Sequence, residues 1–353
     1  MEQEIRFCTS PDGTTIAWAK HGSGPPLVKA GNWLTHLEFD WQSPVWRHWM
    51  EGLGERHTLI RYDERGCGLS DRDPKDLGID AWVADLETVV DAAGVDRFTL
   101  IGVSAAAAIA VAYAARHPER VEGLIAYGGF ARGRAHRGED ARRRMEMLIS
   151  VIGNGWTSPD PAFRRMFTMM FLPEGTPEQM AWYDELQRRS ITPNDAVRLY
   201  QARGVLDVRD LAPQMRAKAL VLHGTGDRVA PFEEGRLLAS LLPNARLVPL
   251  ESVNHVLLEA EPAWSEFLAE VNAFTGTTDT APSSPEELPE LSNRELDVLS
   301  CVALGLDNDE IAARLYISVR TVERHISNIY VKFGVSGKAA RAAAAARFAR
   351  HAG

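Results

Sequence analysis

The sequence predicts an α/β fold followed by a small all-α domain, and four observations support this prediction. The chain has 353 residues, more than one hydrophobic core usually sustains, so two domains are expected. Over residues 1–275, short β-rich runs alternate with helical stretches, which favours a mostly parallel sheet covered by helices on both faces. Residues 276–287 are polar and contain two prolines, which is typical of a linker. The remaining segment, 288–353, shows only helical patterns.

The strands of the first domain are predicted from short apolar runs bounded by polar or glycine-containing segments. These runs span 26–30, 58–62, 98–102, 123–127, 219–223 and 246–250. Helical patterns lie between several of them, for example at 81–93, 105–116 and 231–241. This order of elements predicts successive strand–helix–strand units.

A strand-poor, helical stretch over residues 131–210 interrupts the alternation, and we expect it to form a lid over the strand ends. It holds six of the nine methionines, Met145, Met147, Met166, Met169, Met170 and Met180. Methionines in a helical stretch are often plain core packing, but soft methionine surfaces also suit an apolar ligand cavity. The methionine pattern fits both core packing and a ligand cavity.

Composition excludes several classes of protein. The three cysteines, Cys8, Cys67 and Cys301, are far apart, so neither a disulfide framework nor a zinc site is expected. No glycine-rich phosphate loop is found, and we expect no cofactor and no metal. The N-terminus is acidic and is not a signal peptide, and no apolar run is long enough to cross a membrane. A reducing cytoplasm is the expected location.

Charge is distributed unevenly along the chain. The formal net charge is −9, yet residues 319–353 hold seven Lys or Arg against one acid, Glu323, a balance of +6. The rest of the chain therefore carries −9 − 6 = −15. A basic tail on an acidic body is the expected electrostatic footprint for phosphate, although a solvated basic helix has the same composition.

Three polar residues follow predicted strands in an order that indicates nucleophilic catalysis. Ser104 follows the strand 98–102 and precedes an alanine-rich helix, Asp227 follows the strand 219–223, and His255 follows the strand 246–250. A serine in such a turn is exposed next to the backbone N–H groups of a helix N-terminus. The carboxyl ends of parallel strands also collect catalytic groups.

Residues 1–275 resemble an α/β-hydrolase, with further support from the loop 63–71 and the segment 117–121. The resemblance implies that Ser104 attacks an acyl carbon, His255 takes its proton and Asp227 orients the imidazole. It also implies oxyanion donors from the backbone N–H of Ala105 and from that of Asn32 or Trp33. The sequence departs from the family pattern at Ala106, where the elbow usually has glycine, and at Trp33, which makes the oxyanion loop bulky.

The segment 288–353 carries a second motif. Ser318 precedes a helical stretch with Val322, Ile326 and Ile329 on one face, and Asp307 precedes a shorter helix with Ile311 and Leu315. Two helices joined by a short turn, the second of them basic, are typical of a helix-turn-helix. Residues 291–335 resemble the LuxR-type module, and the stretch from about Lys338 to Arg350 resembles its dimerisation helix.

The resemblance makes 319–333 the recognition helix in the DNA groove. The residues it implies near the DNA are Arg320, Thr321, Val322, Arg324, His325 and Asn328, with Lys332 on the phosphate-backbone side. His325 on its own can equally be a core residue. Arginine reads guanine, whereas lysine contacts to phosphate give affinity without sequence preference.

Together these patterns predict a transcription regulator that binds a double-stranded DNA operator as a homodimer. Its α/β-hydrolase-like domain would sense a small apolar ligand, such as an ester or lactone. Whether the triad also turns over is left open, since Ala106 and Trp33 alter the elbow and the oxyanion loop. One alternative is an active serine hydrolase that clears its own signal, and another is a hydrolase whose tail only dimerises.

Overall fold

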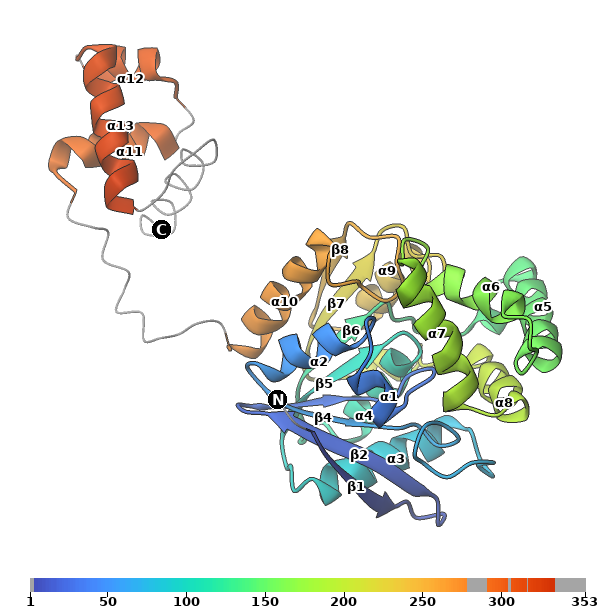
Figure 1. Cartoon of the computed structure of the whole chain (residues 1–353). Coiled ribbons are helices and arrows are strands. Elements are labelled where there is room, and N and C mark those ends of the chain that lie inside the picture. The colour runs from blue at the N-terminus through green and yellow to red at the C-terminus, as the bar shows by residue number, and fades with distance from the viewer. Residues whose placement is uncertain (1–2, 278–290, 304–305, 316, 334–353) are drawn as a thin grey trace. The chain divides into compact units, whose positions relative to one another are not determined.

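The computed structural model describes residues 3–277, 291–303, 306–315 and 317–333 (Figure 1). The chain divides into two compact units, Met1–Thr278 and Asp279–Gly353. The first unit is built on a sheet covered by helices and the second is helical, which confirms the predicted fold class. Most of the expected linker and the whole of the expected dimerisation helix lie outside the described residues.

Within the described residues, the first unit contains an eight-stranded sheet with the order β1-β2-β4-β3-β5-β6-β7-β8. The last six strands in this order run parallel to one another. They are β3 (Pro26–Lys29), β4 (Thr58–Tyr62), β5 (Phe98–Val103), β6 (Val121–Tyr127), β7 (Lys218–Gly224) and β8 (Ala245–Leu250), the six predicted strands. All six residues of β5 are buried, as expected for a strand whose two faces are both covered.

Two strands at the sheet edge were not among those predicted. β1 (Glu4–Thr9) and β2 (Thr15–Gly22) form an antiparallel hairpin, and β2 also pairs antiparallel with β4. Every residue of β1 is at least partly exposed, so this strand lacks the continuous apolar run by which the inner strands were found.

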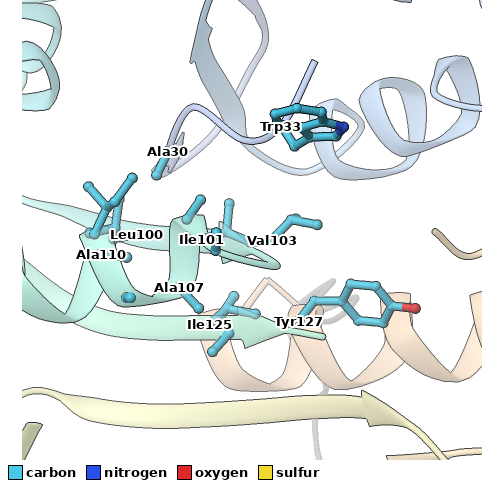
Figure 2. Packing of buried hydrophobic residues seen from close by; sticks show 14 of the residues in the cluster. Ala30, Trp33, Leu100, Ile101, Val103, Ala107, Ala110, Ile125 and Tyr127 are labelled. Carbon is cyan, nitrogen blue, oxygen red and sulfur yellow. The ribbon is translucent and has the colours of Figure 1, made fainter. Parts of the chain in front are cut away.

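The helices of the body are α1 (Leu37–Trp41), α2 (Arg47–Gly54), α3 (Ile79–Ala92), α4 (Ala106–Arg116), α9 (Phe232–Leu241) and α10 (Pro262–Thr275). Of these, α3, α4 and α9 match the three predicted helical stretches to within two residues at each end. Figure 2 shows the small side chains of Ala107 and Ala110 on α4 beside Leu100 and Ile101 of β5 and Ile125 of β6. Because these alanines are small, the helix backbone can approach the sheet closely.

The helical insertion predicted over residues 131–210 lies between β6 and β7 and forms the lid. Its elements are η1 (Arg134–His136), α5 (Glu139–Gly155), α6 (Ala162–Phe171), α7 (Pro177–Ser190) and α8 (Pro193–Gly204), and η2 (Ala212–Gln214) follows before β7. These helices gather at one end of the sheet (Figure 1). The N-termini of α7 and α8 are fixed by Thr176 and Thr192, whose hydroxyls accept backbone N–H bonds in the first turn.

The second unit consists, in its described part, of α11 (Asn293–Ala303), α12 (Asn308–Leu315) and α13 (Val319–Phe333). Both predicted caps are confirmed: Asp307 accepts the Glu310 N–H at 2.9 Å, and Ser318 accepts the Thr321 N–H at 3.2 Å. The unit has its own core, formed by Val298, Leu299, Cys301, Val302, Ile311, Ala312, Val322, Ile326 and Ile329. Across both units, the described helices include none with the length and apolar character needed to span a membrane.

Candidate functional site

Ser104 occupies a strained turn between β5 and α4. Its φ is +58°, in the left-handed region that costs an L-residue roughly 1–2 kcal/mol. The Ser104 N–H donates to the Tyr127 carbonyl at 2.9 Å, and the Ser104 carbonyl accepts from the Ala107 N–H at 3.1 Å. The turn therefore holds the serine between the end of a buried strand and a helix N-terminus, which is the geometry of a nucleophile elbow.

The elbow depends on close approach between strands and helix. A Cβ at Gly102 would lie 2.6 Å from the Ala107 Cα, and a Cβ at Gly129 would lie 2.4 Å from the Ala107 Cβ. Ala106, which stands where the family pattern has glycine, is fully buried beside these contacts. The alanine thus fits the elbow while the conformation of Ser104 is kept.

Asp227 and His255 form a buried pair. The two atoms Asp227 Oδ2 and His255 Nδ1 are 2.6 Å apart, and each side chain is 1% exposed. The other carboxylate oxygen accepts the N–H groups of Val229 and Ala230 at 2.8 and 3.0 Å. Burial alone would raise the pKa of Asp227, but the charge and hydrogen bond of His255, together with the Ala230 N–H, hold that pKa below its ordinary value.

An ionised Asp227 accepts the Nδ1–H of His255, so the second ring nitrogen is left free to accept a proton. That atom, Nε2, is buried and has no hydrogen-bond partner among the described residues. Ser104 is therefore not bonded to His255 in this structure. Such bonds are often long in ligand-free enzymes and shorten when substrate binds. The arrangement can accept a proton from a serine hydroxyl.

A cavity with an empty volume of about 550 Å³, including its opening to solvent, lies over Ser104. Most of its wall is apolar, as expected for a small-molecule site. It is lined by Trp33, Ser104, Ala105, Phe130, Arg134, Phe167, Met170, Phe171, Tyr200, Arg203, Gly204 and Val229. Of the six lid methionines, Met170 alone is in this set, and Met147 and Met169 are each 57% exposed. The methionine-rich stretch therefore contributes more to packing and to the lid surface than to the cavity.

The oxyanion-loop residues divide between two cavities. Trp33 and Ala105 line the Ser104 cavity, whereas Asn32 lines a separate cavity beneath the loop together with Lys29, Asp40 and other residues. The Asn32 side chain accepts from Lys29 Nζ and donates to the Trp33 carbonyl at 3.1 Å. Asn32 thus shapes the loop, and the contribution expected of it toward the ligand is limited to its backbone.

Several functional neighbours were not found from the sequence. Gly128 has a φ of +56°, and a Cβ there would lie 3.2 Å from His255 Cε1. Phe171 of the lid accepts the His255 backbone N–H at 2.9 Å, and its ring meets the imidazole edge-on at 5.2 Å. His223, directly preceding the loop of Asp227, donates through Nε2 to the Ala230 carbonyl at 2.7 Å. Of these neighbours, Gly128 had one signal in the sequence, its position directly after a predicted strand.

In the second unit, α13 presents a polar face. Arg320, Arg324 and Asn328, spaced four residues apart, are exposed on it, and Thr321 and His325 are partly exposed. Residues at this spacing lie on one side of a helix. Of the residues expected near DNA, these five are accessible on the helix.

Two of the residues expected near DNA also pack or pair within the unit, although the Lys332 side chain, 37% exposed, stays accessible. Val322 is fully buried in the core of the unit, so its side chain cannot reach a base from this conformation. Lys332 forms an ion pair with Glu295 of α11 at 2.8 Å, and Glu295 is 5% exposed. The helical period already placed Val322 on the predicted core face of this helix. Its side chain therefore packs in the core.

The comparisons with known proteins agree with this geometry. Residues 39–262 match the family model described as alpha/beta hydrolase fold, and residues 289–345 match the model of bacterial regulatory proteins of the luxR family. A 2-hydroxy-6-oxo-2,4-heptadienoate hydrolase of Pseudomonas putida is 28% identical over 283 residues, covering 73% of this chain and 88% of the relative.

Solved structures share the fold of the first unit. An esterase from Exiguobacterium antarcticum superposes with a TM-score of 0.66 at 22% identity, covering 77% of this chain and 100% of the esterase. An enol-lactonase from Burkholderia xenovorans gives 0.62 at 23% identity, with coverage of 77% and 100%. The chain therefore belongs to the α/β hydrolase fold family and carries, fused to that domain, the DNA-binding domain of the luxR family of bacterial regulatory proteins.

Proposed function

We propose that this protein is a ligand-responsive transcription regulator of the cytoplasm. A small molecule binds in the Ser104 cavity, and two copies of the chain bind an operator through α13. The observation that carries the proposal is the fusion itself: a cavity lined by Ser104, in a unit that also holds the Asp227–His255 pair, shares a chain with a DNA-binding domain. A ligand can change DNA affinity only if it binds one state of the protein more tightly than another.

The lid supplies a physical link between the cavity and the rest of the body. Trp33 of the oxyanion loop packs edge-on against Trp156 and Tyr200 of the lid, with ring centroids 6.0 and 5.6 Å apart. His255 is bonded to Phe171, also of the lid. Because lid residues touch both the loop and the histidine, a ligand that moves either one also biases the position of the lid.

Within this proposal the three polar residues act on an acyl group. Ser104 Oγ attacks the acyl carbon while its proton passes to His255 Nε2, and Asp227 holds the imidazole in the required tautomer. The backbone N–H groups of Ala105 and of Trp33 or Asn32 would hold the resulting oxyanion. Collapse of this intermediate expels the leaving alkoxide, which takes the proton from His255, and water then frees the acyl group.

A second function, hydrolysis of the ligand, is favoured by the 2.6 Å contact between Asp227 and His255 and by the hydrolase relatives. In that case the protein clears its own signal. In the first case Ser104 and His255 chiefly hydrogen-bond the ligand and hydrolysis is slow. The two functions differ in turnover and share the cavity.

The test measures DNA affinity of the full chain with and without short acyl esters and lactones. Ser104→Ala should lose the ligand response and labelling by a serine-directed phosphonate. Ser240→Ala, an exposed serine of α9, is the matched control and should keep both. Fast turnover by the wild type, with DNA affinity indifferent to ligand and to Ser104→Ala, would contradict the regulator and leave the hydrolase.

A further inference from the structure

One part of the Ser104 cavity gathers hydrogen-bond donors. Arg134, Tyr200 and Arg203 all line it, and no Asp or Glu is found among the residues of its wall in the described chain. The remaining wall is mostly aromatic and aliphatic. A ligand that fills this cavity therefore meets an apolar surface in one part and a donor-rich, acceptor-poor surface in another.

Arg203, near the end of α8, has unused donors. The residue is 6% exposed, and its Nη2 donates to Glu64. Its Nε and Nη1 are buried and have no hydrogen-bond partner within the described residues. Burying such donors without acceptors costs free energy, so their retention beside a cavity points to an acceptor on the ligand.

Glu64 holds this arginine in position. The carboxyl group is 1% exposed and follows β4, and its Cβ lies 3.3 Å from where a side chain of Gly31 would begin. Burial raises the pKa of Glu64 to about 7, although the charge of Arg203 acts in the opposite direction. Because Glu64 lies outside the cavity wall, it orients the guanidinium without filling the place of a ligand.

Arg134 supplies a second positive charge to the cavity wall, and Glu64 does not balance it. Its Nη2 donates to the Val229 carbonyl at 2.8 Å, and no carboxylate pairs with it in the described chain. The nearest acid of that region, Glu234, is paired with Arg132 and Arg137. Arg134 also lines a neighbouring surface depression, where the charged residues are Arg134, Arg137, Arg144 and Arg228 against Asp140 and Glu234. This depression, which shares Arg134 with the cavity, therefore also carries more basic than acidic residues.

Tyr200 adds a neutral donor. Its hydroxyl is buried without a hydrogen-bond partner in the part of the chain that the structure describes. Burial raises the pKa of Tyr200, so the hydroxyl keeps its proton and remains able to donate. Two guanidinium groups and a phenol make a set that suits a carboxylate, which accepts several hydrogen bonds and carries the complementary charge.

We propose that the ligand of this cavity is an acyl compound bearing a free carboxylate, such as a monoester of a dicarboxylic acid. The ester lies at Ser104, the carboxylate is held by Arg134 and Arg203 with Tyr200, and the chain between them packs on the aromatic wall. This inference rests on the proposed function for the location of the ligand and adds its chemical class.

The test compares esters that differ only at the far end. Monomethyl succinate, glutarate and adipate are paired with methyl butanoate, pentanoate and hexanoate, so that each pair exchanges a carboxylate for a methyl group. Binding to the full wild-type chain is measured by calorimetry under conditions of low ester turnover. We expect at least one carboxylate member to bind tenfold or more tightly than its neutral partner.

Substitution of the two arginines tests whether their donors cause the preference for a carboxylate. Arg134→Met and Arg203→Met should each reduce the preference for the carboxylate member of a pair over its neutral partner at least threefold. Arg198→Met is the matched control, because Arg198 lies on the same helix and is also ion-paired, to Asp73 and Asp195, but does not line the cavity. If Arg203→Met does not fold, Glu64→Gln combined with Arg203→Met removes both charges together.

Absence of a carboxylate preference at every chain length overturns this inference and leaves the proposed function standing. A preference that survives in both arginine variants also overturns it. Conversely, carboxylate esters that bind with the expected preference and leave DNA affinity unchanged overturn the regulator and leave this inference standing.

Discussion

At the scale of single residues, the site depends on backbone positions as much as on the three polar side chains. Gly128 illustrates this point, because its backbone lies against the ring of His255 and takes a left-handed conformation. An added methyl group meets the imidazole at 3.2 Å, closer than an ordinary van der Waals contact. The residue thus helps to fix the histidine by the close approach of its backbone, which is itself held by the Gly128 N–H bond to the Leu222 carbonyl at 3.0 Å.

We expect Gly128→Ala to slow phosphonate labelling of Ser104 at least tenfold by displacing His255. Gly94→Ala is the matched control, since Gly94 also has a left-handed φ, +69°, but nothing lies within 4 Å of its added Cβ. Both variants should lose about 1 kcal/mol of unfolding free energy from backbone strain. Equal labelling rates in the two variants would show that Gly128 does not position the histidine.

At the scale of elements, α13 divides its residues between an exposed polar face and contacts within the unit. Arg324 is exposed beside Arg320 and Asn328, whereas Lys332 bridges to Glu295 on α11. We expect Arg324→Ala to lower the preference for operator over random duplex by about 1–3 kcal/mol without changing the thermal midpoint of the second unit. Lys332→Met should lower this thermal midpoint and leave the preference for operator unchanged, because it leaves the buried carboxylate of Glu295 without its ion pair.

Circular dichroism melting and duplex titrations measure the two effects separately. An equal loss of affinity for operator and random duplex in Lys332→Met, with normal melting, would return that lysine to the phosphate contacts expected of it. Random-duplex affinity, measured for both variants, is the reference against which the preference is calculated.

Short-range sequence patterns predicted the elements that are determined by residues close together in the chain. The six strands found by their apolar runs include β5, which is covered on both faces, and Ser318 and Asp307 marked helix starts by hydrogen bonds within one turn. Local patterns did not predict β1, whose stability comes from pairing with β2. They also missed Arg203 and Glu64, since a contact across 139 positions has no local pattern.

At the scale of the whole molecule, the two units have separate cores and different spectroscopic labels. All nine tryptophans of the chain fall within residues 18–264. Tryptophan fluorescence therefore reports the hydrolase-fold unit alone, including Trp33 in the cavity wall. Ligand binding can thus be followed in the presence of operator DNA, whose own binding is followed by a label on the duplex.

If ligand and DNA are coupled as proposed, thermodynamic linkage requires the coupling to be reciprocal. A carboxylate ester that changes operator affinity by some factor must have its own affinity changed by the same factor when operator is bound. A coupling of about 1–3 kcal/mol, or roughly 5–150-fold, is the usual range. We expect the two factors, measured independently by tryptophan fluorescence and by duplex titration, to agree within error in the wild type. Both should fall to one in Ser104→Ala if the serine anchors the ligand in the coupled state. Identical ligand affinity with and without operator would mean that the two units act independently, and the protein would then be a hydrolase tethered to DNA.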